Sequence, residues 1–316
     1  MKNILKSLLV TFFPKLNRIR NYYNEIYINP FSDSTSLEKA KNYIERFREI
    51  VSDPLNLLIE RIPEAGYVDK DNKVILHNGV RVPFSGSGSY YERFSEILVI
   101  NRGVHEPLEE YCFQQLILSL RNDLGTHTML ELGAYWGHYS LWFSKTLENS
   151  RCILVEPDNK NILAGKKNFS DNGMSATFIE AFVSKDGFTV DSFLNDKSNN
   201  IIELTVLHSD IQGYEEEMLL MSNEALTQGR IKYLFISTHT EKVHDNCISI
   251  IIGHGYKVTV DSNPKSHTTS SDGFIFAHRS DCHPVISAEK IYGRMDIANT
   301  DSKVKLEYLK NLHSHT

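Results

Sequence analysis

The sequence has few cysteines, and none of them has the spacing of a metal site. Only four of its 316 residues are cysteine, and they lie far apart: Cys112, Cys152, Cys247 and Cys282. No C-x-x-C pair occurs, so neither a cysteine-ligated zinc site nor a disulfide framework is expected. Reduced thiols in a cytoplasmic protein are the simplest interpretation.

A long hydrophobic run is missing near the N-terminus. The apolar stretch from Ile4 to Phe13 is interrupted by Lys6 and followed by Pro14. It is too short to cross a bilayer, and it lacks the small-residue cleavage site of a secretion signal. The surrounding basic residues are Lys2, Lys6, Lys15, Arg18 and Arg20. We expect a surface helix packed on the domain, and peripheral membrane contact through this segment is the alternative.

An excess of positive charge is also missing. The net charge is −6, which argues against a nucleic-acid partner, and a hydrophobic content of 41% is ordinary for a globular protein. The length allows one large domain with additions. We expect an N-terminal helical and β-hairpin extension over residues 1–100, a main domain over 101–283 and a polar tail over 284–316. The tail is a candidate for contact within a homo-oligomer.

The stretch over residues 129–140 combines an apolar run with a glycine turn. The run ends at Glu131, Gly133 and Gly137 follow, and an amphipathic segment comes next. This order predicts the first strand, turn and helix of a nucleotide-binding α/β unit. Gly133 permits a tight turn with its backbone close to a ligand, and Gly137 lets the helix begin close to the strand. A strand, turn and helix without a ligand is the alternative.

The same turn lacks the G-x-G-x-x-G spacing of a dinucleotide site. Tyr135 and Trp136 stand where a pyrophosphate would approach the backbone. The E-x-G-x-x-x-G spacing suits S-adenosylmethionine, which carries no phosphate and can use a carboxylate for its ammonium group or ribose.

A second apolar run, over residues 151–156, ends in Glu156. A carboxylate at the end of the second strand binds ribose hydroxyls in Rossmann-like sites. Glu156 could instead cap the helix expected to begin near Asp158. Together with the first motif, it indicates a nucleoside cofactor.

A third segment, Asp210-x-x-Gly213-x-Glu215, follows the apolar run over residues 201–207. With the Glu-x-Gly-Ala and Val-Glu-Pro segments upstream, it resembles the FkbM family of S-adenosylmethionine-dependent methyltransferases. The resemblance runs from about Gly103 to Ala277 and includes the Glu-Pro segment near residue 106. That family usually has asparagine where this chain has Tyr135, so contacts to the methionine end are expected to differ.

From residue 128 onward, expected strands and helices alternate, which indicates a parallel sheet. Strands are expected over 128–132, 151–156, 176–183, 201–209, 231–238, 256–261 and 273–278. Helices are expected over 107–120, 137–148, 158–171, 214–222 and 242–254. The resemblance implies the Rossmann-like class I methyltransferase fold, a seven-stranded, mostly parallel sheet flanked by helices, in which the last strand is antiparallel.

The first hundred residues have patterns of their own. A helix is expected over 36–51, and a hairpin is expected around residues 69–72, with a further turn at Asn78-Gly79. Residues 85–89, Ser-Gly-Ser-Gly-Ser, are typical of a flexible loop. We expect Tyr90 and Tyr91 beside this loop, and also Glu106, to contact the acceptor.

Eight residues are expected to contact the cofactor: Glu131, Gly133, Tyr135, Gly137, Glu156, Glu180, Ala181 and Asp210. Glu180 and Ala181 are included because they end the expected third strand, where adenine contacts are predicted.

Methyl transfer from a sulfonium is an in-line displacement, so the protein mainly positions the acceptor. A hydroxyl acceptor also needs a proton acceptor or a metal ion. Asp210 and His239 end neighbouring strands, so we expect His239 as the base, Asp210 as its partner and His208 as a further catalytic candidate. The alternative is Mg²⁺ held by Asp210, His239 and Glu241.

These features predict an S-adenosylmethionine-dependent O-methyltransferase. The expected acceptor is a hydroxyl on a sugar, glycan or related small natural product. A non-catalytic nucleoside-binding or scaffold protein that retains the fold is the alternative.

Overall fold

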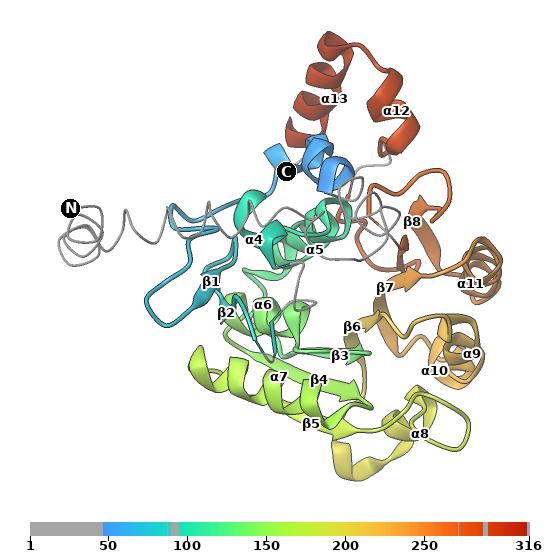
Figure 1. The fold of residues 1–316 in the computed structure, drawn as a ribbon. Coiled ribbons are helices and arrows are strands. Elements are labelled where there is room, and N and C mark those ends of the chain that lie inside the picture. Colours follow the sequence, from blue (N-terminus) through green and yellow to red (C-terminus); the bar gives the residue numbers. More distant parts are fainter. Residues whose placement is uncertain (1–46, 87, 90–94, 271, 287–289, 315–316) are drawn as a thin grey trace, which may run out of the picture. The chain divides into compact units, whose positions relative to one another are not determined.

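The computed structural model describes residues 47–86, 88–89, 95–270, 272–286 and 290–314. The chain forms two compact units, residues 1–48 and 49–316, and the labelled elements of Figure 1 belong to the second. The basic N-terminal segment, most of the expected 36–51 helix, Tyr90 and Tyr91 lie outside the described residues. The domain boundaries expected near residues 100 and 284 remain predictions.

A seven-stranded sheet organises the second unit (Figure 1). Its strands are β3 (His127–Leu132), β4 (Ser150–Glu156), β5 (Thr177–Glu180), β6 (Leu204–Ser209), β7 (Ile231–Thr238), β8 (Lys257–Ser262) and β9 (Gly273–His278). Their order is β5-β4-β3-β6-β7-β9-β8, and only β9 runs antiparallel to its neighbours. This is the expected Rossmann-like class I methyltransferase fold.

Helices connect and flank these strands. They are α5 (Pro107–Leu120), α6 (His138–Thr146), α7 (Asn159–Asp171), α8 (Val190–Asn195), α9 (Glu215–Leu220), α10 (Asn223–Thr227) and α11 (Glu241–Gly253). The helix expected over 214–222 is α9, whereas α8 and α10 were not expected. Every residue of β3, β6 and β9 is buried, as in a sheet covered on both faces.

The edge of the sheet is less regular than its centre. β5 has only four residues, and both of its ends are exposed, so the strand expected over 176–183 is shorter than predicted. In the centre of the sheet, β6 begins at Leu204, three residues after the expected start at 201. Edge strands bury fewer side chains, and their lengths are therefore weakly marked in a hydrophobic pattern.

A small β-element precedes the sheet. β1 (Lys73–Ile75) pairs antiparallel with β2 (Arg81–Pro83) across the Asn78-Gly79 turn, and Gly79 has a φ of +82°. The hairpin expected around residues 69–72 is present: Val68 bridges Val74, Ile75 donates its N–H to the Tyr67 carbonyl (2.9 Å), and Asp69 donates to the Lys73 carbonyl (2.8 Å). A 3-10 helix η1 (Pro54–Leu57) and a helix α4 (Glu96–Ile100) complete this part.

Two helices follow the sheet, where the sequence pattern predicted only short helices in a polar tail. These are α12 (Arg294–Asn299) and α13 (Ser302–Ser314). Tyr308 and Leu312, four residues apart on α13, are buried. An ion pair of 3.1 Å joins the Arg294 guanidinium to Glu49. Among the described residues, no helix has both the length and the apolar character needed to cross a membrane.

Candidate functional site

A cavity of about 350 Å³ opens at the carboxyl ends of β3, β4 and β6. β3 lies between β4 and β6 in the sheet, which is the switch point where open α/β sheets bind ligands. Seven residues singled out from the sequence line it: Glu106, Glu131, Gly133, Tyr135, Glu156, His208 and Asp210. Gly137, Glu180, Ala181, His239 and Glu241 do not line it.

The turn after β3 depends on glycine at two positions. Gly133 has a φ of +67°, and a Cβ there would overlap the backbone carbonyl of Asp210. Gly137 has a φ of +83°, and a Cβ there would lie 2.7 Å from Cδ2 of Leu154 on β4. Gly133 therefore lets the ends of β3 and β6 meet, and Gly137 lets α6 begin against the sheet.

The Glu156 carboxylate orders the backbone of this turn through hydrogen bonds. Its carboxylate accepts hydrogen bonds from the backbone N–H groups of Tyr135 (3.0 Å) and Asp158 (3.0 Å) and from the Asn161 amide (3.1 Å). A carboxylate has about four acceptor positions, so roughly one remains for a ligand hydroxyl. The alternative prediction, that Glu156 caps the following helix, therefore describes part of its role, because the carboxylate orders the loop that leads into α7.

The cavity has an acidic lining. Glu106, Glu131, Glu156 and Asp210 contribute carboxyl groups, and none of the described residues that line it is lysine or arginine. Glu131 accepts a hydrogen bond from the Ser140 N–H at 3.1 Å. Burial raises the pKa of Glu131, and the neighbouring His208 opposes that rise. A cationic ligand suits such a cavity better than a phosphate.

Glu106 adds a carboxyl group of another kind. Burial raises its pKa to about 8, His105 opposes that rise, and the nearby Glu109 contributes to it. Glu106 is therefore mainly protonated at neutral pH and can donate a hydrogen bond. The Tyr139 hydroxyl donates to its Oε2 at 3.4 Å.

Glu109 on α5 is the functional candidate that sequence reasoning missed. Its Oε1 lies 2.6 Å from Nε2 of His208, and its Oε2 accepts a hydrogen bond from the Ser237 hydroxyl at 2.9 Å. Because the carboxylate accepts, Nε2 of His208 carries the proton. His208 Nδ1 has no hydrogen-bond partner among the described residues. Burial alone would lower the pKa of His208, but the bond to Glu109 raises it above the usual 6.5.

His239 lies behind Asp210, outside the cavity lining. Its Nδ1 is hydrogen-bonded to Glu215 at 3.0 Å, and its Nε2 lies 3.2 Å from Asp210 and 3.6 Å from Asp272. Burial acts to lower the pKa of His239, but these carboxylates outweigh it and raise the pKa to about 10. An imidazole that is already protonated cannot accept a proton. The expected role of His239 as the base does not fit this arrangement.

The expected magnesium ligands do not come together either. Glu241 forms an ion pair with Lys265 at 3.2 Å, and Glu215 takes its place beside Asp210 and His239. Both ring nitrogens of His239 already face carboxylate oxygens, which suits a protonated imidazole rather than a metal ligand.

The end of β5 also differs from the expectation. Glu180 is exposed and accepts a hydrogen bond from the Asn159 amide at 2.7 Å. The next residues along the chain, Phe182 and Val183, line the cavity instead of Glu180 and Ala181.

No protein-family model matches the chain, and no curated protein is similar to it in sequence. Its fold is similar to solved structures. The precorrin-6y C5,15-methyltransferase of Geobacter metallireducens GS-15 is 17% identical, with a TM-score of 0.38, over 52% of this chain and 86% of that one. The ribosomal protein L11 methylase of Lactobacillus delbrueckii subsp. bulgaricus is 10% identical, with a TM-score of 0.36, over 54% and 79%.

M. capricolum TrmK in complex with S-adenosyl-homocysteine is 11% identical, with a TM-score of 0.39, over 63% of this chain and 81% of that one. Similarity at this level says nothing about substrate or cofactor, which depend on the residues of the cavity. The resemblance to the FkbM family stays a prediction.

Proposed function

We propose that this protein is an S-adenosylmethionine-dependent methyltransferase. The observation that carries the proposal is the acidic cavity at the carboxyl ends of β3 and β4, with Glu131 and Glu156 in its wall. S-adenosylmethionine brings a sulfonium, an ammonium group and ribose hydroxyls, and it has no phosphate. Buried carboxylates complement each of these groups, whereas they would repel the pyrophosphate of a dinucleotide.

We further propose that the acceptor is a hydroxyl and that His208 is its base. The acceptor oxygen attacks the methyl carbon, the carbon–sulfur bond breaks, and the hydroxyl proton passes to Nδ1 of His208. S-adenosylhomocysteine is the leaving group. Glu109 fixes the proton of His208 on Nε2, so the lone pair is on Nδ1, a buried atom that has no hydrogen-bond partner among the described residues. Asp210, in the cavity wall beside this histidine, is a candidate to hold the acceptor.

The class of acceptor follows from the resemblance to the FkbM family. A sugar, glycan or related small natural product offers several hydroxyls. Asp210 can accept a hydrogen bond from such a hydroxyl, and the protonated Glu106 can donate one to it. A role in glycan biosynthesis or a related small-molecule pathway is therefore part of the proposal.

Glu156→Ala is expected to weaken S-adenosylmethionine binding by about 1–3 kcal/mol, because a hydrogen bond from the ribose to a buried carboxylate is lost. That loss corresponds to roughly a 5- to 150-fold higher Kd. Isothermal titration of the purified variant with S-adenosylmethionine measures the change, and a thermal melt reports whether the loop that Glu156 orders has survived.

Glu180→Ala is the matched control. Glu180 is also a carboxylate at the end of a strand, next to Glu156 in the sheet register, but it is exposed and outside the cavity. Its removal is expected to leave the Kd unchanged. Equal Kd values for the wild type and the Glu156 variant would remove Glu156 from the cofactor site. A wild-type chain that binds the cofactor but transfers no methyl group to any hydroxyl acceptor would favour the non-catalytic alternative.

A further inference from the structure

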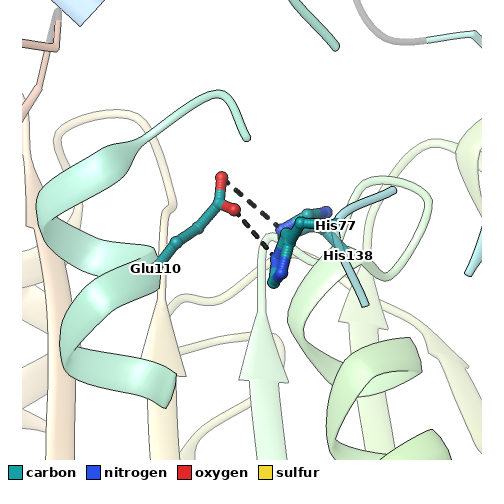
Figure 2. A group of neighbouring side chains, drawn as sticks. All are labelled: His77, Glu110 and His138. Carbon is teal, nitrogen blue, oxygen red and sulfur yellow. Dashed lines mark ion pairs between the residues drawn. The ribbon is translucent and has the colours of Figure 1, made fainter. Parts of the chain in front are cut away.

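A second cluster of titratable side chains lies beside the cavity. His77 follows β1, Glu110 lies on α5, and His138 is the first residue of α6. All three are buried: their exposed fractions are 1%, 0% and 7%. Figure 2 shows Glu110 projecting from its helix toward the two imidazole rings. The three ligand atoms lie within 4.8 Å of one another.

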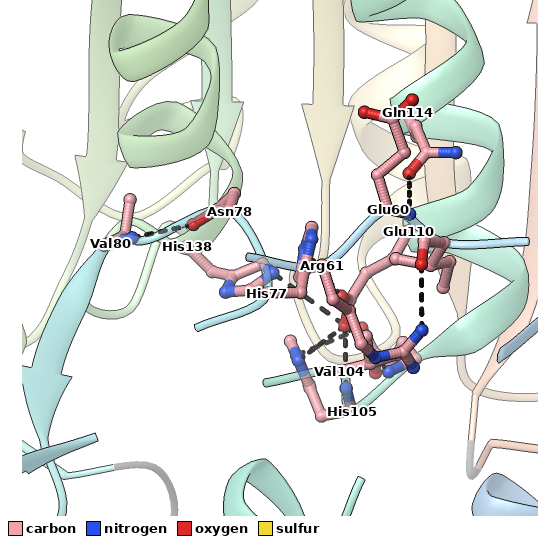
Figure 3. Close-up of polar contacts among 12 residues, drawn as sticks. Glu60, Arg61, His77, Asn78, Val80, Val104, His105, Glu110, Gln114 and His138 are labelled. Atoms are coloured by element: carbon pink, nitrogen blue, oxygen red, sulfur yellow. Dashed lines mark hydrogen bonds and ion pairs between the residues drawn. The ribbon is translucent and has the colours of Figure 1, made fainter. Parts of the chain in front are cut away.

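The backbone around the cluster fixes two of its members. Ile62 donates its N–H to the His77 carbonyl at 2.9 Å. A Cβ on Gly103, whose φ is +85°, would overlap the His77 backbone, so this glycine allows the two segments to lie side by side. Glu110 Oε1 accepts hydrogen bonds from the N–H groups of His105 (2.8 Å) and Glu106 (3.0 Å) (Figure 3). The cluster is therefore held before any ligand enters.

The Glu110 carboxylate faces both histidines. His77 Nε2 forms an ion pair with Glu110 Oε2 at 3.1 Å, and His138 Nε2 lies 3.9 Å from Oε1. Both ring nitrogens of His138 are buried, and neither has a hydrogen-bond partner among the described residues. Buried polar atoms are rarely left in this state, and an ion that is not part of the chain is one established cause.

The separations match those of atoms that share a metal ion. Zinc binds histidine nitrogen and carboxylate oxygen at about 2.0–2.2 Å in tetrahedral geometry, which places neighbouring ligand atoms roughly 3.3–3.5 Å apart. The observed 3.1 Å and 3.9 Å lie on either side of that range. A small movement of the His138 ring would complete the geometry.

We propose that His77, Glu110 and His138 bind one divalent transition-metal ion of the zinc type. Two imidazoles and one carboxylate are the ligand set of several zinc sites, and nitrogen ligands select transition metals over magnesium. His105 Nδ1 lies 2.8 Å from Glu110 Oε1, so a third imidazole lies beside the site. His105 and His138 also line the cavity, and the bound ion lies in its wall.

The cluster differs in kind from the group formed by Asp210, Glu215 and His239. In that group, three carboxylates surround the imidazole of His239 and raise its pKa. One of them, Glu215, is hydrogen-bonded to it. In the proposed site, the single carboxylate of Glu110 faces the imidazoles of His77, His105 and His138. The proposal stands independently of the methyltransferase activity, because metal binding is measured without cofactor or acceptor.

The test is a titration of the full chain, freed of metal by chelation, with Zn²⁺. We expect one equivalent to bind the wild type with high affinity, Mg²⁺ not to compete, and the melting temperature to rise with Zn²⁺ because the ion binds only the folded chain. His77→Gln and His138→Gln, each changing one ligand, are expected to weaken Zn²⁺ binding at least tenfold. His283→Gln, which removes an exposed histidine, is the matched control and is expected to bind as the wild type does.

His239→Gln separates the two candidate groups. If this variant loses Zn²⁺ and the His77 and His138 variants keep it, the ion belongs to the Asp210 group and the proposal is overturned. X-ray absorption of the zinc-loaded wild type covers the case in which a variant does not fold. Nitrogen and oxygen neighbours at about 2.0–2.2 Å support the site, whereas sulfur at about 2.3 Å, or no stoichiometric zinc, contradicts it.

Discussion

His208→Gln is expected to lower kcat for methyl transfer by about 10²–10⁴, because the reaction loses its general base. Glutamine retains a polar group of similar length but cannot take a proton at neutral pH. The Kd for S-adenosylmethionine is expected to change little, since Glu156 and Glu131 remain in the cavity wall. The measurement is S-adenosylhomocysteine release over a panel of sugar and natural-product hydroxyl acceptors, followed by steady-state kinetics on the best of them.

The pH profile tests the same assignment in a second way. The hydrogen bond to Glu109 raises the pKa of His208, so the rising limb of kcat/KM is expected above pH 6.5. Glu109→Gln removes the charge that causes the rise, and it is expected to move this limb to lower pH as well as to slow the reaction. A purely structural role for Glu109 would lower the amount of folded enzyme and leave the limb in place.

His283→Gln is the control for both experiments, because it removes an exposed histidine outside the cavity. Wild-type kcat in the His208 variant would reject this histidine as the base. Asp210 in the cavity wall, or positioning of the acceptor alone, would then carry the reaction.

The fold was largely predictable because the signal is local. Each central strand is a short apolar run followed by a turn, and each long helix has an amphipathic pattern, so the alternation of elements can be seen along the chain. The errors in the predicted helices and strands occur where tertiary packing, rather than the local sequence, determines which elements form. β5 ends at Glu180, three residues before the expected end at 183. α13 buries only a narrow side that includes Tyr308 and Leu312, which is a weak hydrophobic pattern.

The site was predictable only where it follows the strand ends. Glu131, Glu156 and Asp210 end or follow strands, and the topology of a parallel sheet brings such residues to one edge. Glu109 lies 99 residues before His208 on a preceding helix, and no spacing in the sequence connects them. The surroundings of His239 were also not predictable from spacing. Its place after β7 is as expected, but the carboxylates around it come from the 210–215 segment and from Asp272.

The free energy of unfolding is expected to fall as the pH rises from neutral toward 10, because His239 loses the proton that stabilises the folded state. Its pKa is about 10 in the folded chain and about 6.5 when unpaired, so the folded state binds its proton more tightly. The stabilisation is therefore complete below pH 6.5 and is lost as the pH rises through about 10. At about 1.4 kcal/mol per unit, the loss is on the order of a few kcal/mol. Urea unfolding at pH 7, 8.5 and 10 measures it.

His239→Gln isolates this contribution, because both proteins share every other group that titrates in the alkaline range. The substitution leaves the neighbouring carboxyl groups in place, so the only titrating group that differs between the two proteins is the imidazole. The variant is expected to be less stable than the wild type at pH 7, and the gap in unfolding free energy is expected to close as the pH approaches 10. A gap that stays constant would mean that His239 is neutral in the folded chain at pH 7, and that histidine would again be a candidate for the base.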